Sequence, residues 1–186
     1  VERQVTGWAG RYDKARTDDH PEMEELSAWL LANQPDDGRP ALIHNDYKYD
    51  NLMLDAQEMT RIVAVLDWEM ATIGDPLMDL GTTLAYWIEP TDPEELHFRA
   101  FGPTMLPGSM SREELVGRYF EKTGLATDRL HFYCGYGLFK LAVIIQQIYA
   151  RYVRGHTQDP RFADLRTTVE HLARRGVQVI HDNNLP

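Results

Sequence analysis

The sequence contains little cysteine and lysine and no long apolar segment. Its 186 residues include one cysteine, Cys134, so a disulfide framework and a structural zinc site built from cysteines are both excluded. The longest uninterrupted apolar runs, such as residues 141–145, are five residues long, whereas a membrane-spanning helix needs about 20 apolar residues. The N-terminus also lacks the basic and apolar regions of a signal peptide. We therefore expect a cytoplasmic protein without a membrane partner.

Basic residues are also scarce relative to acidic ones. The chain has 19 Lys and Arg against 29 Asp and Glu, which gives a formal net charge of −10. No cluster of Lys or Arg forms a stripe that could follow a phosphate backbone, so we expect no nucleic-acid partner. The apolar content of 43% suffices for one hydrophobic core. We predict a single domain over residues 1–186.

Most of the chain has the apolar spacing of helices, interrupted by a stretch of short apolar runs. The short runs predict three strands, of which the second and third form a hairpin: 41–43, 52–54 and 62–66. Helical spacing predicts the helices 1–17, 21 onward, 77–88, 111–124, 130–153 and about 160–180. Residues 89–110 look irregular. These patterns predict an α+β fold that is mainly α.

The expected helix boundaries rest on capping signals. Ser111 and Glu114 have the spacing of a capping box, and Gly124 follows that helix as a C-terminal stop. Thr127 or Asp128 is expected to cap the next helix. Because residues 130–153 are apolar on nearly every face, we expect that helix to lie at the centre of the core.

Polar residues lie beside the predicted strands in two segments, HNDYKYDNLMLD at residues 44–55 and VAVLDWE at residues 63–69. Strand ends that converge on one loop would bring Asp46, Asn51 and Asp67 within reach of a common point. Magnesium ions take a few carboxylate or amide oxygens together with substrate phosphates. This pattern is therefore typical of phosphoryl transfer from ATP, which needs a base and cations more than covalent chemistry.

Each of these residues has a predicted role. Asp46 is the expected catalytic base that orients the acceptor hydroxyl, and Lys48 is expected to contact the transferred phosphoryl group. Asn51 and Asp67 are the expected ligands of the magnesium ion that holds the ATP phosphates. Glu69 is a further candidate metal contact, with a structural ion pair as the alternative. For the Asp and Asn residues the competing interpretation is an ordinary turn or cap position.

The same motifs resemble a known family. Residues 44–51 are similar to the H-x-D-x-K-x-x-N loop of protein kinases and to the H-G-D-x-x-x-x-N loop of the aminoglycoside phosphotransferase and choline kinase family. Protein kinases follow with Asp-Phe-Gly, whereas residues 67–69 are the Asp-aromatic-Glu variant of the small-molecule kinases. Residues 74–80 resemble the family's G-D-P-x-x-D-L helix start. The resemblance implies a protein-kinase-like C-terminal lobe with short strands around the catalytic loop, and an ATP- and magnesium-dependent kinase.

The resemblance also implies an acceptor class. The arrangement of residues 133–155 is similar to bacterial homologues of the kinase domain that is fused to some acyl-CoA dehydrogenases. It implies a small-molecule hydroxyl acceptor, with a hydroxyacyl-CoA as one candidate. Three residues could line the acceptor pocket, although aromatic residues at helical spacing usually belong to the core: Tyr86, Trp87 and Lys140.

The sequence departs from the family pattern at two points. Asn45 replaces the usual glycine, which is tolerable if the position does not need a positive φ angle. The sequence also has no G-x-G-x-x-G, and Lys14, the lysine upstream of the catalytic loop, sits in a helical segment. We therefore expect the N-terminal ATP-binding lobe to be absent and the chain, which begins at Val1, to be inactive alone.

Several polar residues have structural interpretations. We expect His44 to support the backbone beside Asp67 rather than to act as a base. Asp75 and Asp79, at a predicted helix start, are expected to stabilise the helix dipole or anchor the catalytic loop rather than to bind metal.

Two other functions compete with the kinase. The first is a non-catalytic kinase-like module for binding or scaffolding, against which the intact set of Asp46, Asn51 and Asp67 argues. A metal-dependent hydrolase that uses His44, Asp46 and Asp67 would leave Lys48 and Asn51 without a role.

Overall fold

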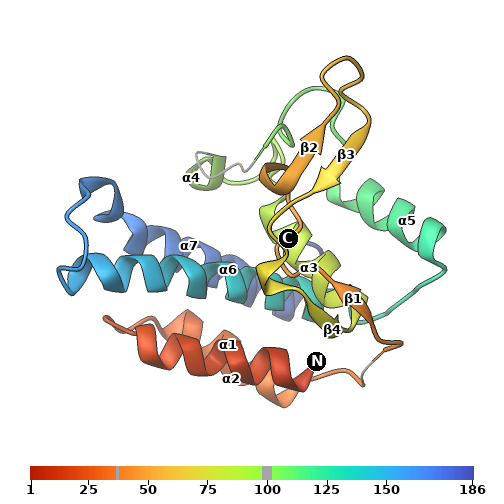
Figure 1. Cartoon of the computed structure of the whole chain (residues 1–186). Helices are drawn as coiled ribbons and strands as arrows, with labels where there is room; N and C mark the ends of the chain where they lie inside the picture. The colour runs from red at the N-terminus through yellow and green to blue at the C-terminus, as the bar shows by residue number, and fades with distance from the viewer. Residues whose placement is uncertain (37, 98–101) are drawn as a thin grey trace.

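The computed structural model describes residues 1–36, 38–97 and 102–186, and it is mostly helical (Figure 1). Its α-helices are α1 (Glu2–Ala15), α2 (Pro21–Ala32), α3 (Pro76–Tyr86), α4 (Glu94–His97), α5 (Arg112–Thr123), α6 (Leu130–Val153) and α7 (Leu165–Asp182). The described residues also form short 3₁₀ helices: η1 (Tyr49–Asn51) and η2 (Trp68–Met70) lie between strands, and η3 (Pro160–Phe162) lies between α6 and α7. None of the helices in these described ranges has the length and apolar character that a bilayer crossing requires.

Helix α6 forms the centre of the core, as its apolar residues on nearly every face predict. It packs against α1, α2, α3 and α7 (Figure 1). Its contact with α3 is close because glycines meet there: a Cβ on Gly137 would come within 2.1 Å of the carbonyl oxygen of Gly81. This crossing places α3, which carries several residues of the site, firmly on the core.

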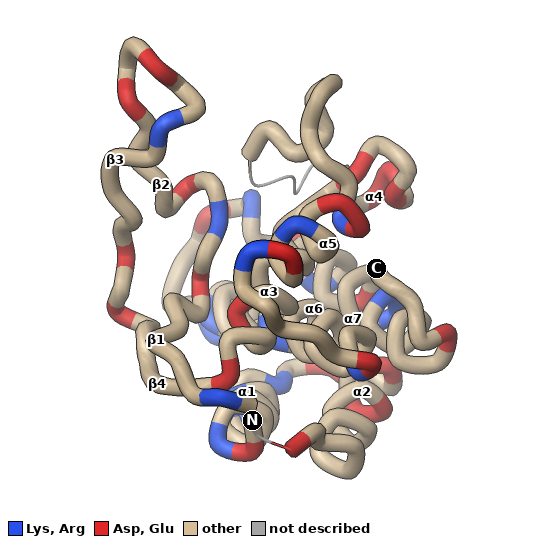
Figure 2. The backbone as a smooth tube through the Cα atoms, turned by 90° about the vertical axis from the view of Figure 1, so that its right-hand side faces the viewer, with Lys and Arg blue, Asp and Glu red and all other residues tan. Residues whose placement is uncertain are grey.

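The strands form two separate antiparallel pairs. Strand β2 (Leu52–Leu54) pairs with β3 (Ile62–Val65), so the predicted hairpin is confirmed, and it projects from the helices (Figures 1 and 2). Strand β1 (Ala41–Ile43) pairs with β4 (Thr72–Gly74). The sequence does not predict β4, because a strand of three residues leaves almost no periodic signal. The second pairing brings the end of β1 beside the segment that follows Asp67.

The described helix boundaries correct three expectations. Arg129, rather than Thr127 or Asp128, is the N-cap of α6, and it makes no side-chain cap bond; Thr127 accepts a hydrogen bond from the Arg129 amide instead. The last helix begins at Leu165 rather than near residue 160, because the Asp159 side chain caps the separate turn η3. The irregular stretch 89–110 contains α4, and its residues 98–101 lie outside the described residues.

Other boundary predictions are confirmed. The Ser111 side chain accepts a hydrogen bond from the Glu114 amide, and the Glu114 side chain accepts one from the Ser111 amide, so the capping box is complete. Gly124 ends α5 at φ 69°, a left-handed conformation that glycine adopts without steric cost. Acidic and basic residues are interspersed along the chain (Figure 2).

Candidate active site

The turn after β1 is anchored by an aspartate of α3. The backbone amides of His44 and Asn45 donate to Oδ2 and Oδ1 of Asp79, each at 2.7 Å. Asp75 caps α3 through the Leu77 amide. Both aspartates therefore have the structural roles that we expected, and Asp79 holds the loop that presents the candidate base.

Asn45 occupies a position that needs a positive φ angle. Its φ is 66°, in the left-handed region where glycine and asparagine are tolerated better than other residues. The condition under which we expected the substitution to be harmless therefore does not hold. Asparagine is tolerated here because its backbone adopts the left-handed conformation more readily than that of most residues. Its side chain also makes contacts that a glycine would lack.

His44 links the two polar turns of the site. Its ring is buried, with Nε2 2.7 Å from the Leu66 carbonyl oxygen and Nδ1 3.2 Å from the Asp46 amide. Since Nδ1 accepts from a backbone N–H, the ring proton belongs on Nε2, which donates to Leu66. Both nitrogens are occupied, so the structural role expected for His44 beside Asp67 is confirmed.

The Asp46 carboxylate has a partner on each oxygen. The Tyr86 hydroxyl donates to Oδ1 at 2.6 Å, and Asn51 Nδ2 donates to Oδ2 at 3.0 Å. Lys48 Nζ lies 3.3 Å from the same Oδ2 and 4.9 Å from the centre of the Tyr86 ring. The structure thus brings together Asp46, Lys48 and Asn51, which the sequence motif had suggested as a unit.

Tyr86 is a site residue that sequence reasoning missed in this role. It was considered only as part of an acceptor pocket, because nothing local connects it with Asp46, 40 positions earlier. Burial, and then its hydrogen bond to Asp46, raise the pKa of the Tyr86 hydroxyl far above the usual value. Tyr86 therefore remains protonated near neutral pH and acts as a fixed hydrogen-bond donor to the candidate base.

The candidate metal ligands lie on adjoining backbone segments. The Leu66 amide donates to the Asn51 carbonyl oxygen at 2.8 Å. Asp67 therefore follows the residue that is hydrogen-bonded to Asn51. Asn51 Nδ2 is used by the Asp46 backbone and side chain, so Oδ1 is the atom left to bind a cation. Asp67 has φ 63° and an exposed side chain, and Glu69 is exposed in η2.

This donor set is suited to magnesium bound together with phosphate. One amide oxygen and one carboxylate leave positions for phosphate oxygens and water, as magnesium requires. Within the described part of the chain, no group of three or more His, Cys, Asp or Glu side chains could hold a metal by itself. The site is therefore no closed protein cage, and the metal roles of Asn51, Asp67 and Glu69 stay predictions.

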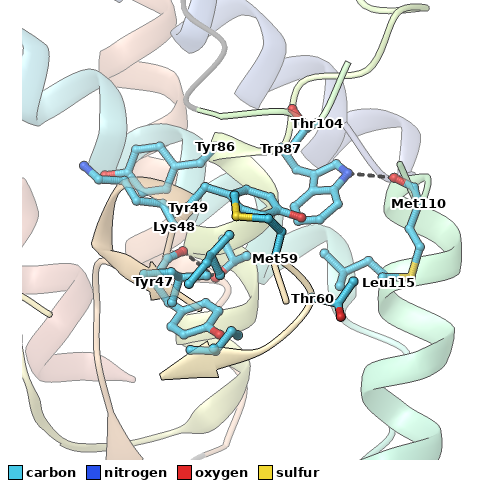
Figure 3. A pocket seen from close by; sticks show the side chains of 14 residues that line it. Tyr47, Lys48, Tyr49, Met59, Thr60, Tyr86, Trp87, Thr104, Met110 and Leu115 are labelled. Carbon is cyan, nitrogen blue, oxygen red and sulfur yellow. Dashed lines mark hydrogen bonds between the residues drawn. The ribbon is translucent and has the colours of Figure 1, made fainter. Parts of the chain in front are cut away.

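A cavity of about 480 Å³ opens beside Lys48 and Tyr86 (Figure 3). Aromatic and aliphatic side chains dominate its lining, with Tyr49 and Trp87 facing Leu115 of α5 (Figure 3). A second cavity of about 440 Å³ lies among apolar residues of α6, and Lys48 and Tyr86 also line it. Two mainly apolar cavities therefore meet at the pair that contacts Asp46.

Lys140, which we had considered as a possible pocket residue, lines neither of these cavities. It is 1% exposed, and its ammonium group donates to the backbone carbonyl oxygen of Asn45. Burial lowers its pKa to about 8, although the charges of Asp46 and Asp79 favour the protonated form. Lys140 thus supports the loop that carries Asp46.

Cys134 is buried, and burial raises the pKa of its thiol to about 12, so a core role is confirmed.

Comparisons with known proteins identify a family and relatives for this chain. The model of the phosphotransferase enzyme family matches residues 1–131. The chain is 37% identical over 184 residues to acyl-CoA dehydrogenase family member 11 of Gallus gallus, and 34% identical over 180 residues to the same family member of Homo sapiens. Each alignment covers 95% of this chain and 23% of the relative. The chain therefore spans about a quarter of the length of these relatives.

A solved structure shares the fold. The crystal structure of a Ralstonia eutropha JMP134 protein assigned to the aminoglycoside phosphotransferases matches with a TM-score of 0.80 at 27% sequence identity. The match covers 97% of this chain and 55% of that chain. The expected kinase-like, mainly helical fold is therefore confirmed, and with the family match over residues 1–131 the chain belongs to the phosphotransferase enzyme family.

Proposed function

We propose that the chain is the catalytic lobe of an ATP- and magnesium-dependent phosphotransferase that acts on the hydroxyl group of a small molecule. The observation that carries this proposal is the environment of Asp46. Its carboxylate is held by a neutral donor, Tyr86, on one oxygen and by Asn51 and Lys48 on the other. Tyr86 and Lys48 each line both cavities. A carboxylate held in one orientation beside a cavity can orient an acceptor hydroxyl for attack.

The neighbouring residues complete the proposed chemistry. Lys48 would move from Asp46 towards the transferred phosphoryl group and neutralise the charge that develops there. Asn51, through Oδ1, and the exposed Asp67 would hold magnesium, with Glu69, two residues after Asp67 on η2, as a further candidate contact. The ion, when bound, supplies positive charge for the phosphate oxygens. Asp46 needs only to hold the acceptor hydroxyl in line and take its proton.

The cavities favour an acceptor with an apolar portion. The larger cavity is lined mainly by apolar and aromatic side chains such as Leu52, Met59 and Trp87, and the second by Leu141 and Ile144. A hydroxyacyl-CoA has a hydroxyl group on a carbon chain that apolar walls of this kind could accommodate. We propose this class as the first acceptor to test, ahead of the cationic aminoglycosides and choline.

ATP is proposed to bind with the help of a second lobe. None of the four lysines lies on a strand: Lys14 is in α1, Lys48 in the catalytic loop, Lys122 in α5 and Lys140 in α6. The sequence has no G-x-G-x-x-G loop to cover the phosphates. We therefore propose that these 186 residues transfer phosphate only when they are joined to an ATP-binding lobe.

Asp46→Asn tests the proposed base. In the complete native polypeptide with Mg-ATP, we expect the substitution to lower the turnover of a hydroxyacyl-CoA by about 10²–10⁴-fold, because a positioned base is lost. ADP formation and phosphorylated product would be measured by mass spectrometry. Asp50→Asn is the matched control: Asp50 is exposed in the same loop, and we expect its activity to remain close to the parent value.

Two outcomes would contradict the proposal. Unchanged turnover in Asp46→Asn would remove Asp46 from the mechanism. A complete polypeptide that binds Mg-ATP, yet phosphorylates no member of a panel of hydroxyacyl-CoAs, aminoglycosides and choline, would favour the non-catalytic module. Calorimetry on the isolated chain is an independent check, because tight Mg-ATP binding there would contradict the need for a second lobe.

A further inference from the structure

The side chains of His44 and Asn45, which are neighbours in the sequence, each bind one end of the turn that carries Asp67. His44 Nε2 binds the carbonyl oxygen of Leu66, the residue before Asp67. Asn45 Nδ2 donates to the carbonyl oxygen of Met70, three residues after Asp67, at 2.9 Å. The residues immediately before Asp46 thus set the position of the turn that presents the candidate metal ligand.

Asn45 is fully engaged in this arrangement. It is 3% exposed, its amide donates to Asp79, and its carbonyl oxygen accepts from Lys140. Its side-chain Oδ1 accepts from Nε2 of Gln4 in α1 at 3.1 Å. The two side-chain hydrogen bonds, to Met70 and from Gln4, are the ones that a glycine at this left-handed position would lack.

The orientation of both side-chain amides is determined by their partners. The Tyr136 hydroxyl of α6 lies 3.2 Å from Gln4 Oε1, and burial raises the pKa of Tyr136 so that it stays protonated and can donate. Gln4 then donates to Asn45, and Asn45 donates to Met70. If the Asn45 amide were rotated by 180°, its Nδ2 would face Gln4 Nε2, a second donor, and its Oδ1 would face the Met70 carbonyl oxygen, a second acceptor. The hydrogen bonds from Tyr136 to Met70 therefore have one favourable direction.

We propose that Asn45 is a positioning residue for Asp67, and that Gln4 keeps its amide in the active orientation. Through Asn45, helix α1 and the core helix α6 would control the distance between the base Asp46 and the metal ligand Asp67. This inference rests on the proposed function for its catalytic meaning. The coupling between Asn45 and the 66–70 turn is a property of the fold, and it can be measured without catalysis. Partners that orient metal ligands affect metal affinity or activity by about 10–100-fold.

Hydrogen–deuterium exchange on the chain itself tests the coupling. Asn45→Gly keeps the positive φ angle without strain and removes both side-chain hydrogen bonds. We expect amide exchange in residues 66–71 to become at least about tenfold faster, while exchange in α6 stays unchanged. Asn183→Gly is the matched control, because Asn183 also has a positive φ, 55°, and is exposed at the end of α7. Unchanged exchange at 66–71 in Asn45→Gly would overturn the proposal.

A second measurement addresses Gln4 and the metal. Gln4→Met removes the hydrogen bond to Asn45 with little change in side-chain volume, and we expect it to speed exchange at 66–71 in the same direction as Asn45→Gly. In the complete polypeptide, both variants should raise the magnesium concentration that gives half-maximal activity by about tenfold, with the acceptor KM unchanged. A loss of thermal stability with an unchanged magnesium requirement would show a merely structural role and overturn the proposal. If the parent protein transfers no phosphate, the proposed function fails, while the exchange result still decides the coupling.

Discussion

Asp46 shows how a few contacts determine the properties of a single side chain. Its Oδ1 accepts from Tyr86, a neutral donor, and its Oδ2 faces Asn51 and Lys48. Both oxygens are held, so the carboxylate has one defined orientation beside Lys48 and Tyr86, which line both cavities. The Tyr86 contact comes from the end of α3, and it makes that helix part of the site.

Replacing Tyr86 by phenylalanine isolates this contact. Tyr86→Phe keeps the ring that lines the cavities and removes the donor to Oδ1. We expect kcat to fall by about tenfold, because the base loses one of its restraints, with the KM for Mg-ATP unchanged. Steady-state kinetics on the complete polypeptide would measure both values. Tyr119→Phe, which removes only a 3.5 Å contact with Pro76, should leave kcat at the parent value; equal kcat in both variants would contradict the role of Tyr86.

At the scale of secondary structure, the site depends on the crossing of α3 and α6. Helix α3 carries Asp79, which binds the backbone of the loop before Asp46, and Tyr86, which binds the Asp46 carboxylate. Helix α6 carries Lys140, which contacts Asn45. The two helices approach closely because Gly81 and Gly137 have no side chains at the crossing. The two glycines therefore set the distance between α3 and α6. That distance determines how Asp79 and Tyr86 of α3 are placed relative to Lys140 of α6.

A methyl group at the crossing should separate the helices. In Gly137→Ala, the new Cβ would lie 2.1 Å from the Gly81 carbonyl oxygen, so the backbones must move apart. We expect the free energy of unfolding to fall by about 2 kcal/mol or more. Gly117→Ala is the matched control in α5, where a Cβ meets no atom within 4 Å, and helix propensity predicts a gain of about 0.5–1 kcal/mol. Urea unfolding followed by circular dichroism would measure both, and similar stabilities would show that the crossing is not tight.

At the scale of the whole molecule, the strands leave apolar side chains in solvent. Leu42 of β1 and Ile73 of β4 are directly opposite each other in the strand pairing and are 63% and 61% exposed. Val63 and Trp68 are also about half exposed. Exposed apolar side chains that lie beside each other, as Leu42 and Ile73 do, favour association between molecules. The helical core, in contrast, buries its apolar residues almost completely.

This surface predicts that the isolated chain associates with itself. The double variant Leu42→Thr and Ile73→Thr places β-branched threonines at both positions of the pair and removes most of its apolar area. We expect its sedimentation to be that of a monomer at concentrations where the parent chain forms larger species, with Tm within about 3 °C of the parent. Leu31→Thr, at a single exposed leucine of α2, serves as the control and should sediment like the parent. Identical sedimentation of the double variant and the parent would exclude this surface as the cause.

Much of the fold was predictable because its signals are local. The capping box of Ser111 and Glu114 and the stop at Gly124 depend on residues that are neighbours along the chain. The buried character of α6 follows from apolar residues on all its faces. Strand β4 and the true start of α6 were not predictable in this way. A three-residue strand exists only through its partner, and the end of a helix depends on which of several possible caps the surrounding structure allows.

The catalytic loop and the Asp67 turn were recognisable because each lies within a few residues of sequence. What the sequence determined by itself was therefore the set of polar groups and the family to which they point. The tertiary structure alone decided that Tyr86 binds Asp46, that Lys140 supports the loop, and that Asn45 joins α1 to the turn after Asp67. These contacts join residues between 25 and 95 positions apart. Their energies arise only after packing has brought the partners together, so no local pattern in the sequence records them.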